Sequence, residues 1–318
     1  MSPTKLRRQD YTIGWVCALD AELAATRIML DEEHPPLDQA AGDTNLYTLG
    51  RIGYHNVVIA CLPAGQIGTN SAAAVATQIK ASFKSVQLYL MVGVGGGVPG
   101  TTDIRLGDVV VSQPQNGHGG VVQYDFGKTI KGRLKRTGFL SAPSTMLLNA
   151  VVRSRSNHLL GKSSFQKYIS CFESLPAFSR NNTGPDILFE ADYNHAGGAS
   201  CQQCSKHRIM RRDPRRIPLV HYGTIASGNQ VMRDGRTRDR ISSDFQGVLC
   251  FEMEAAGLMN NFQCLVIRGI SDYSDSHKND RWRTYAAGTA AACAKDILEE
   301  IPVVEVAATK ANTKITLV

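Results

Sequence analysis

Carboxylate side chains stand near the ends of three strand-like segments of the chain. Asp272 closely follows the apolar run 264–270, Glu254 follows the run 248–252, and Glu22 comes just after the first apolar run. Open α/β sheets bind ligands at the carboxyl ends of their strands, so these side chains can converge on one rim. Glycoside cleavage through an oxocarbenium-like transition state needs such a set: an acid for the leaving group, a base for water and an anion beside the sugar.

The same carboxylates also have a structural interpretation. Asp20, Glu22, Glu252 and Glu254 lie near predicted helix starts, where an acid can simply complement the helix dipole. We expect the side chains of Glu252 and Glu254 to point to opposite faces of their strand, so that one of them faces a ligand. Composition therefore permits glycoside cleavage without establishing it.

A glycine cluster, MVGVGGGV at 91–98, directly follows a continuous apolar strand at 86–93. Its backbone can approach a ligand closely and expose successive N–H groups. The cluster is not a GxGxxG that opens a helix, and no GKS or GKT follows, so dinucleotide and P-loop sites are disfavoured. Taken alone, it is better explained as a structural turn.

The periodicity predicts alternating strands and helices, and hence one α/β domain with a large central sheet. Predicted strands cover 11–19, two segments within 47–62, 86–93, 108–112, 220–227, 248–252 and 264–270; predicted helices cover 20–30, 70–83, 237–244, 255–261 and 282–300. We expect an N-terminal extension at 1–10, the domain at 11–302 with an insertion at about 161–218, and a partly disordered tail at 303–318.

Composition argues against a membrane protein and against a nucleic-acid partner. The 318 residues are 43% hydrophobic and contain no apolar run long enough to span a bilayer. The net charge of +7 owes much to the basic segment 206–216, which has no aromatic residues and is expected to be a solvated loop. The start of the chain does not resemble a secretory signal. We therefore expect a cytoplasmic protein.

The eight cysteines do not form a disulfide framework. Four of them lie in apolar strand-like runs, where a free cysteine acts as a small hydrophobe: Cys17, Cys61, Cys250 and Cys264. Cys201 and Cys204 are spaced CxxC, with His195 and His207 nearby, which fits a zinc knuckle or a redox pair. The second half of a four-cysteine site is missing, so we favour a polar loop and expect no metal in the chemistry.

The chain resembles the nucleoside phosphorylase and nucleosidase superfamily, and most closely a fungal purine nucleosidase-like domain found at the head of multidomain receptor-like proteins. The resemblance rests on YTIGWVCALDAE, LMVGVGGGVP, HYGTIASGNQVMRDG and FEMEAAGLMNNFQCLVIRGISDYSDSHK, and covers nearly all of 11–300 outside the insertion. It implies a twisted, partly barrel-like central mixed sheet flanked by helices. It also implies chemistry without a cofactor, and a homodimer whose neighbouring subunit helps to close the pocket.

By similarity to the methylthioadenosine/adenosylhomocysteine nucleosidases, the resemblance implies a role for each carboxylate. Glu22 would activate the attacking water, Asp272 would protonate N7 of the purine, and Glu254 would hold the ribose hydroxyls, with Met253 against the sugar face. Burial would have to keep Asp272 neutral before catalysis. The substrate pocket would also include the backbone around Gln230 and Val231, and the glycine cluster at Val94, Gly95 and Gly96.

The sequence departs from the phosphorylases where they bind phosphate. Their arginine and their serine or threonine correspond to Met91 and Val94, and their early glycine-rich turn is replaced by 17–22. A phosphate dianion without a cationic partner is poorly compensated in a dry site. Hydrolysis of a purine nucleoside to free base and ribose is therefore preferred to phosphorolysis.

The 5′ side of the ribose leaves other functions open. A set of arginines could hold a 5′-phosphate, as in an ATP nucleosidase, although solvated surface positions are preferred for them: Arg105, Arg233, Arg236 and Arg238. An apolar 5′ pocket would indicate methylthioadenosine. A nucleotide-sensing module without turnover is a further alternative, which the presence of Glu22, Glu254 and Asp272 disfavours.

Overall fold

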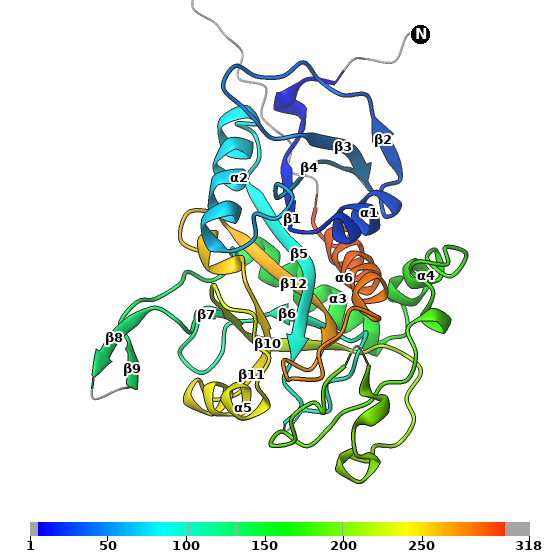
Figure 1. Cartoon of the computed structure of the whole chain (residues 1–318). Helices are drawn as coiled ribbons and strands as arrows, with labels where there is room; N and C mark the ends of the chain where they lie inside the picture. The colour runs from blue at the N-terminus through cyan, green and yellow to red at the C-terminus, as the bar shows by residue number, and fades with distance from the viewer. Residues whose placement is uncertain (1–5, 101, 131–132, 199, 303–318) are drawn as a thin grey trace, which may run out of the picture.

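A computed structural model describes residues 6–100, 102–130, 133–198 and 200–302, and most of its strands join one large mixed sheet (Figure 1). The strands are β1 (Ile13–Cys17), β2 (Glu32–His34), β3 (Tyr47–Ile52), β4 (His55–Cys61), β5 (Leu88–Gly97), β6 (Val109–Ser112), β7 (Val121–Gln123), β8 (Gly127–Ile130), β9 (Arg133–Arg136), β10 (Val220–Ser227), β11 (Val248–Glu252) and β12 (Cys264–Asp272).

Part of this sheet closes into a barrel of five strands. The strand order is β11-β10-β6-β12-β5-β1-β4-β3-β2, with β7 beside β10. Strand β11 also pairs with β5 in antiparallel register, which joins the two ends of the segment β11-β10-β6-β12-β5. Strands β1, β4, β3 and β2 extend from β5 as an open wing, and β8 and β9 form a separate hairpin. The partly barrel-like mixed sheet expected from the resemblance is confirmed.

Helices cover both faces of the sheet. They are α1 (Asp20–Ile28), α2 (Thr69–Ser82), α3 (Thr145–Leu159), α4 (Phe165–Ser170), α5 (Gly235–Asp244) and α6 (Arg283–Leu298), with short 3₁₀ turns η1 (Arg8–Asp10), η2 (Arg180–Asn182), η3 (Cys201–Gln203), η4 (Lys206–Arg208) and η5 (Ala255–Gly257). Neighbouring strand residues point to opposite faces, so Trp15 packs in the cluster with α6 and Val16 in the cluster with α2. None of the described helices is long and apolar enough to cross a membrane.

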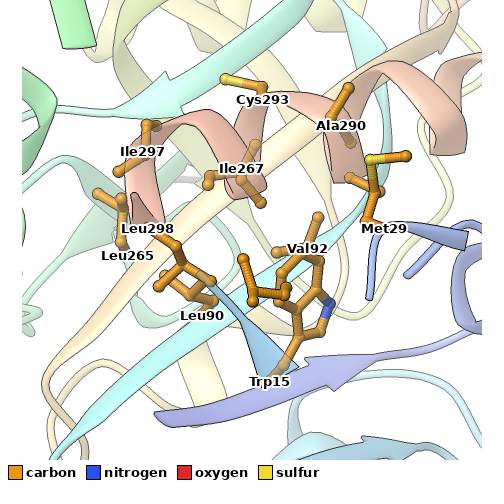
Figure 2. Packing of buried hydrophobic residues seen from close by; sticks show 14 of the residues in the cluster. Trp15, Met29, Leu90, Val92, Leu265, Ile267, Ala290, Cys293, Ile297 and Leu298 are labelled. Carbon is orange, nitrogen blue, oxygen red and sulfur yellow. The ribbon is translucent and has the colours of Figure 1, made fainter. Parts of the chain in front are cut away.

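Helix α6 is buried along almost its whole length, and its small side chains explain how. Every residue from Tyr285 to Leu298 is buried, and six of these fourteen residues are alanines. Figure 2 shows Ala290, Cys293 and Ile297 of this helix against residues of β1, β5 and β12. A Cβ added at Gly269 of β12 would lie 1.9 Å from the carbonyl oxygen of Ala286, so glycine lets the helix backbone approach the sheet. The close-packed core fixes β5 and β12 firmly.

The structure corrects several predicted elements. The glycine cluster is not a turn, because β5 continues through Gly97. The predicted helix at 255–261 is the short turn η5, where a Cβ at Gly257 would collide with the backbone of Thr69. Helix α3, helix α4 and the hairpin β8–β9 were not predicted from the sequence. The expectations for residues 1–5 and 303–318 lie outside the described residues.

The basic segment 206–216 is not simply a solvated loop. Arg212 donates to both carboxylate oxygens of Asp186 at 3.0 Å, and Arg215 donates to buried Asp108 at 2.6 Å. Both arginine side chains are less than a fifth exposed. Asp186 belongs to the insertion itself, whereas Asp108 directly precedes β6, so Arg215 holds residues 161–218 against the sheet. The expectation of a solvated segment is wrong for these two residues.

Candidate active site

All nine residues singled out for the substrate site line one cavity of about 180 Å³ at the carboxyl ends of β1, β5, β11 and β12. They are Glu22, Val94, Gly95, Gly96, Gln230, Val231, Met253, Glu254 and Asp272. The parallel pairing of β1, β5 and β12 brings these strand ends to the same edge. The position is the one that open α/β sheets use for ligands.

Glu22 lies in the first turn of α1 and its carboxylate is fixed by backbone N–H groups. Ala18 and Leu19 donate to Oε2 at 2.7 and 3.0 Å, and Val94 of β5 donates to Oε1 at 2.8 Å. Burial raises the pKa of Glu22, while Arg268 and these N–H groups oppose that rise. A carboxylate has about four acceptor sites, so one site remains for a water molecule in the cavity.

Two glycines of β5 let carboxylates come close to the strand. A Cβ at Gly93 would lie 2.4 Å from Oε1 of Glu22, and a Cβ at Gly96 would lie 2.7 Å from Oδ1 of Asp272. Distances below about 3 Å are far inside van der Waals contact, so any larger residue would displace the carboxylate. The glycine cluster therefore positions both acids, a role that reading it as a turn did not capture.

Arg268 lines the cavity and was not predicted from the sequence as a site residue. Its guanidinium is buried in β12, forms ion pairs with Glu252 and with Glu254 (Nη2 to Oε2 3.3 Å), and donates to the carbonyl of Val94 at 3.2 Å. Glu252 and Glu254 therefore reach the same side, and the prediction that they face opposite sides is wrong, because side chains two residues apart share a strand face. A single arginine inside the apolar run CLVIRGI was the available signal.

Asp272 ends β12 and is buried, but it is not isolated. Ser271 donates its hydroxyl to Oδ2 at 2.8 Å, Ser274 donates its backbone N–H to Oδ1 at 2.9 Å, and Lys278 forms an ion pair with Oδ2. The expected burial is confirmed. The ammonium group of Lys278 therefore occupies one carboxylate oxygen of Asp272 at the cavity.

Burial also changes the protonation of Glu254. Loss of solvent raises the pKa of Glu254 to about 7, and Arg268 opposes the rise while Glu252 and Glu22 add to it. The backbone N–H of Gly68 approaches the same carboxylate at 3.4 Å. The group therefore changes charge near neutral pH, where a carboxylate with an ordinary pKa would stay ionised.

One wall of the cavity is formed by the segment that follows β10, where Gln230, Val231 and Met232 line it. The hydroxyl of Tyr124 donates to the carbonyl of Gln230 at 2.9 Å, which fixes the backbone that follows β10. Asn229 next to it accepts from the N–H of Thr69 at 3.1 Å and joins this wall to the start of α2. Val231 and Phe251 both line the cavity; Val231 is half-exposed and Phe251 is buried.

The residues considered for phosphate binding mostly lie elsewhere. Met91 is fully buried in the core, and Val94 meets the cavity with its N–H committed to Glu22. Of the four candidate arginines, Arg105 pairs with Asp103, Arg236 pairs with Asp192, and Arg238 is buried against Asp239 and the carbonyl of Tyr273; Arg233 lines the neighbouring cavity. The surface interpretation is therefore wrong for Arg238. Lys278 and Arg283, which the sequence reading did not name, line the site itself.

Within the described parts of the chain, one group of side chains is placed to share a metal ion, and it does not belong to this cavity. It consists of His195, Cys201 and Cys204 in the insertion. His207, the other histidine considered there, is exposed in η4. The pocket itself presents carboxylates and backbone groups.

The chain belongs to the phosphorylase superfamily, whose family model matches residues 12–301. This fold of a closed mixed barrel with flanking helices is shared with the 5′-methylthioadenosine/S-adenosylhomocysteine nucleosidase of Neisseria meningitidis, solved in complex with methylthio-immucillin-A. That structure superposes with a TM-score of 0.59 at 18% identity, over 91% of this chain and 98% of the other.

Three relatives differ in length and in name. A nucleotide-binding leucine-rich repeat (NLR)-like protein of Hyaloscypha variabilis is 45% identical over 92% of this chain, which spans 30% of that protein. A 5′-methylthioadenosine/S-adenosylhomocysteine nucleosidase of Mycobacterium bovis is 24% identical, over 92% of this chain and 97% of its own. The ATP nucleosidase Cap17 of Escherichia coli is 25% identical, over 73% of this chain and 39% of its own.

Proposed function

We propose that the chain is a purine nucleosidase, which hydrolyses the N-glycosidic bond of purine ribonucleosides to free base and ribose. The observation that carries the proposal is the convergence of Glu22, Glu254 and Asp272 on one cavity. Glu22 activates the water, Asp272 protonates N7 of the leaving purine, and Glu254 holds the ribose hydroxyls. Met253 lies against the sugar, and the Gln230–Val231 backbone lines the base pocket.

The charges of the cavity suit a cationic transition state. Its acidic lining residues, Glu22, Glu252, Glu254, Asp272 and Asp280, outnumber its basic ones, Arg268, Lys278 and Arg283. Positive charge that develops on the ribose is therefore stabilised, and the stabilisation is strong because four of these carboxylates are buried. A fixed carboxylate beside the sugar supplies this without reorganisation.

Hydrolysis is favoured over phosphorolysis because Arg268, the cation beside Glu22, already pairs with two carboxylates, Glu252 and Glu254. Lys278 and Arg283 each pair with one carboxylate, Asp272 and Asp280. A phosphate dianion next to Glu22 would need a cation without such a partner. Water needs none.

A second candidate is hydrolysis of a purine nucleotide such as ATP. Lys278 and Arg283 line the cavity, and their partners are single carboxylates that phosphate oxygens could replace. The similarity to an ATP nucleosidase supports the same reading. If ATP is the substrate, Arg283→Ala raises KM for ATP at least tenfold and leaves KM for adenosine unchanged; an equal effect on both substrates assigns Arg283 no role towards phosphate.

The residues around the cavity and the cysteines of the chain are compatible with a homodimer and with a cytoplasmic location. Ile67 and Val231 are about half-exposed at the pocket, as apolar residues covered by a neighbouring subunit of a homodimer would be. The free cysteines accord with the reducing cytoplasm in which we expect the protein to act in purine salvage.

The direct test is chromatography of free base released from inosine, guanosine, adenosine and ATP, with and without phosphate. The proposal predicts base and free ribose at a rate that phosphate does not change. Binding of all four without base release would instead favour a sensing module. The variant Glu22→Gln should lose base release, because it removes the proposed base. Glu33→Gln, on an exposed carboxylate, is its matched control and should keep base release.

A further inference from the structure

The geometry points to a structural zinc site formed by His195, Cys201 and Cys204 in the insertion, separate from the substrate cavity. The two thiol sulfurs and a ring nitrogen of the histidine lie within 4.8 Å of one another. Two ligands of a tetrahedral zinc ion are about 3.3–3.8 Å apart, so small side-chain rotations complete the set. Mixed thiolate and imidazole ligands select zinc among the common divalent ions.

The backbone of the loop brings these residues together. Leu188 and Glu190 exchange hydrogen bonds with Arg208 and Met210 (2.9 Å each), which closes a loop around all three ligands. Cys201 begins the 3₁₀ turn η3, and its carbonyl accepts from the N–H of Cys204 at 3.1 Å. A CxxC pair around such a turn presents both sulfurs on one side, as zinc knuckles require.

A second histidine gives an independent sign of a ligand. His277 is 9% exposed, and neither of its ring nitrogens has a hydrogen-bond partner in the described structure; the carboxylate of Asp275 lies 3.7 Å from Nδ1, beyond hydrogen-bond distance. It lines the same cavity of about 160 Å³ as His195 and Cys201, and its ring centre lies 5.5 Å from that of His195. Buried imidazole nitrogens without partners cost free energy. A shift of this ring supplies the fourth ligand.

Zinc binding requires one local change at His195. The N–H of Gly197 donates to Nδ1 of this ring at 3.0 Å. A neutral imidazole that binds metal through Nε2 carries its proton on Nδ1, and one that binds through Nδ1 cannot accept there, so the contact must break in either case. Gly197 and Gly198 both have positive φ and lie in open space, which lets this segment turn.

The site would join the insertion to the loop that follows Asp272. The backbone N–H of His195 donates to the hydroxyl of Ser276 at 2.9 Å, and Phe189 stacks on His277 at 4.0 Å. The walls of the two cavities share Asp272 and Lys278. A metal at this position therefore holds the loop that carries Lys278, and its role is positioning of that loop, not catalysis.

The test is the metal content of the purified full chain after loading with zinc and desalting. We expect about one zinc ion per chain, less than a tenth of that in Cys201→Ser/Cys204→Ser, and an unchanged content in Cys171→Ser, whose thiol is exposed. Cobalt titration of the wild type, which does not depend on a variant that folds, should give thiolate-to-metal charge-transfer bands and tetrahedral d–d bands. His277→Ala should weaken cobalt binding at least tenfold.

Two results would overturn the site. The first is wild-type protein without stoichiometric zinc and without tetrahedral cobalt bands. The second is a Cys201–Cys204 disulfide that forms in air and reverses with thiol while zinc in excess fails to prevent it, because a redox pair and a zinc site compete for the same thiolates. Neither readout depends on nucleosidase activity.

Discussion

The rim of the barrel and the insertion at 161–218 both contain buried charge, but they are built in different ways. At the rim, strand register and glycines place Glu22, Arg268 and Asp272, and regular hydrogen bonds fix the backbone that carries them. In the insertion, Arg212 pairs with Asp186 of the same segment and Arg215 pairs with Asp108 of the neighbouring fold, both from irregular backbone. In the first arrangement burial raises the pKa of Glu22, and the second arrangement uses charges to hold a loop in place.

The largest expected effect comes from removing the rim carboxylates. Glu22→Gln and Asp272→Asn keep the side-chain shape and remove the base and the acid, so we expect kcat to fall about 10²–10⁴-fold in each. The steady-state rate of base release at saturating substrate measures kcat. Asp244→Asn, on an exposed carboxylate, is the control for Asp272→Asn and should retain full activity. Near-normal turnover in both rim variants would refute the assignment of these residues.

The next effect concerns the close approach of β5 to Glu22. In Gly93→Ala the new Cβ would lie 2.4 Å from Oε1 of Glu22 and 2.8 Å from Nη1 of Arg268. Displacement of the base by about 1 Å should lower kcat about 10²-fold. Gly100→Ala, where nothing lies within 4 Å, is the matched control. Equal activity of the two variants would mean that the position of Glu22 is not set by the strand.

A smaller effect is expected from pH. The pKa of Glu254 is raised to about 7 and that of Glu22 is raised as well, and both groups act as anions in the proposed mechanism. Acid therefore protonates them early, and kcat/KM should fall as the pH drops below about 7, by up to tenfold per unit. Glu254→Gln should move this limb to lower pH. A profile that stays flat down to pH 5 would contradict the burial argument.

The smallest effect on turnover is expected from the insertion. Arg215→Met removes one ion-pair partner of Asp108, which is 1% exposed, while His221 and the N–H of Leu219 still donate to it. We expect a loss of about 1.5–3 kcal/mol in the free energy of unfolding, measured by denaturant titration, with kcat within twofold of the wild type. Arg211→Met, on an exposed side chain, should change neither quantity. Equal stability of both variants would show that this contact does not dock the insertion.

The rim could be predicted from the sequence because its signals are local. Apolar runs that end in an acid or a glycine locate strand ends, and the strand ends meet at one edge once the sheet forms. All nine chosen residues lie on one cavity for this reason. Helix α3 was not predicted, although the sequence contains a signal for it. Ser144 caps the helix, and the buried residues follow at helical spacing: Leu147, Ala150, Val151 and Ser154.

The partners of these residues were harder to predict. The pairing of Arg268 with Glu252 and Glu254 depends on a contact between two strands, and that of Lys278 with Asp272 depends on a loop that turns back. The directions of Arg212 and Arg215 depend on acids more than 25 residues away along the chain. A charged residue in an apolar segment indicates that an oppositely charged partner is needed, but the tertiary structure determines which residue that partner is.

In the proposed mechanism, water attacks the ribose of a purine nucleoside in this cavity. The identity of the sugar product tests this step when wild-type protein cleaves inosine or adenosine in a buffer that contains phosphate. Hydrolysis should give free base with free ribose, at the same rate when phosphate is left out. Ribose 1-phosphate as the product, with no release in phosphate-free buffer, would contradict it and assign the site to phosphorolysis.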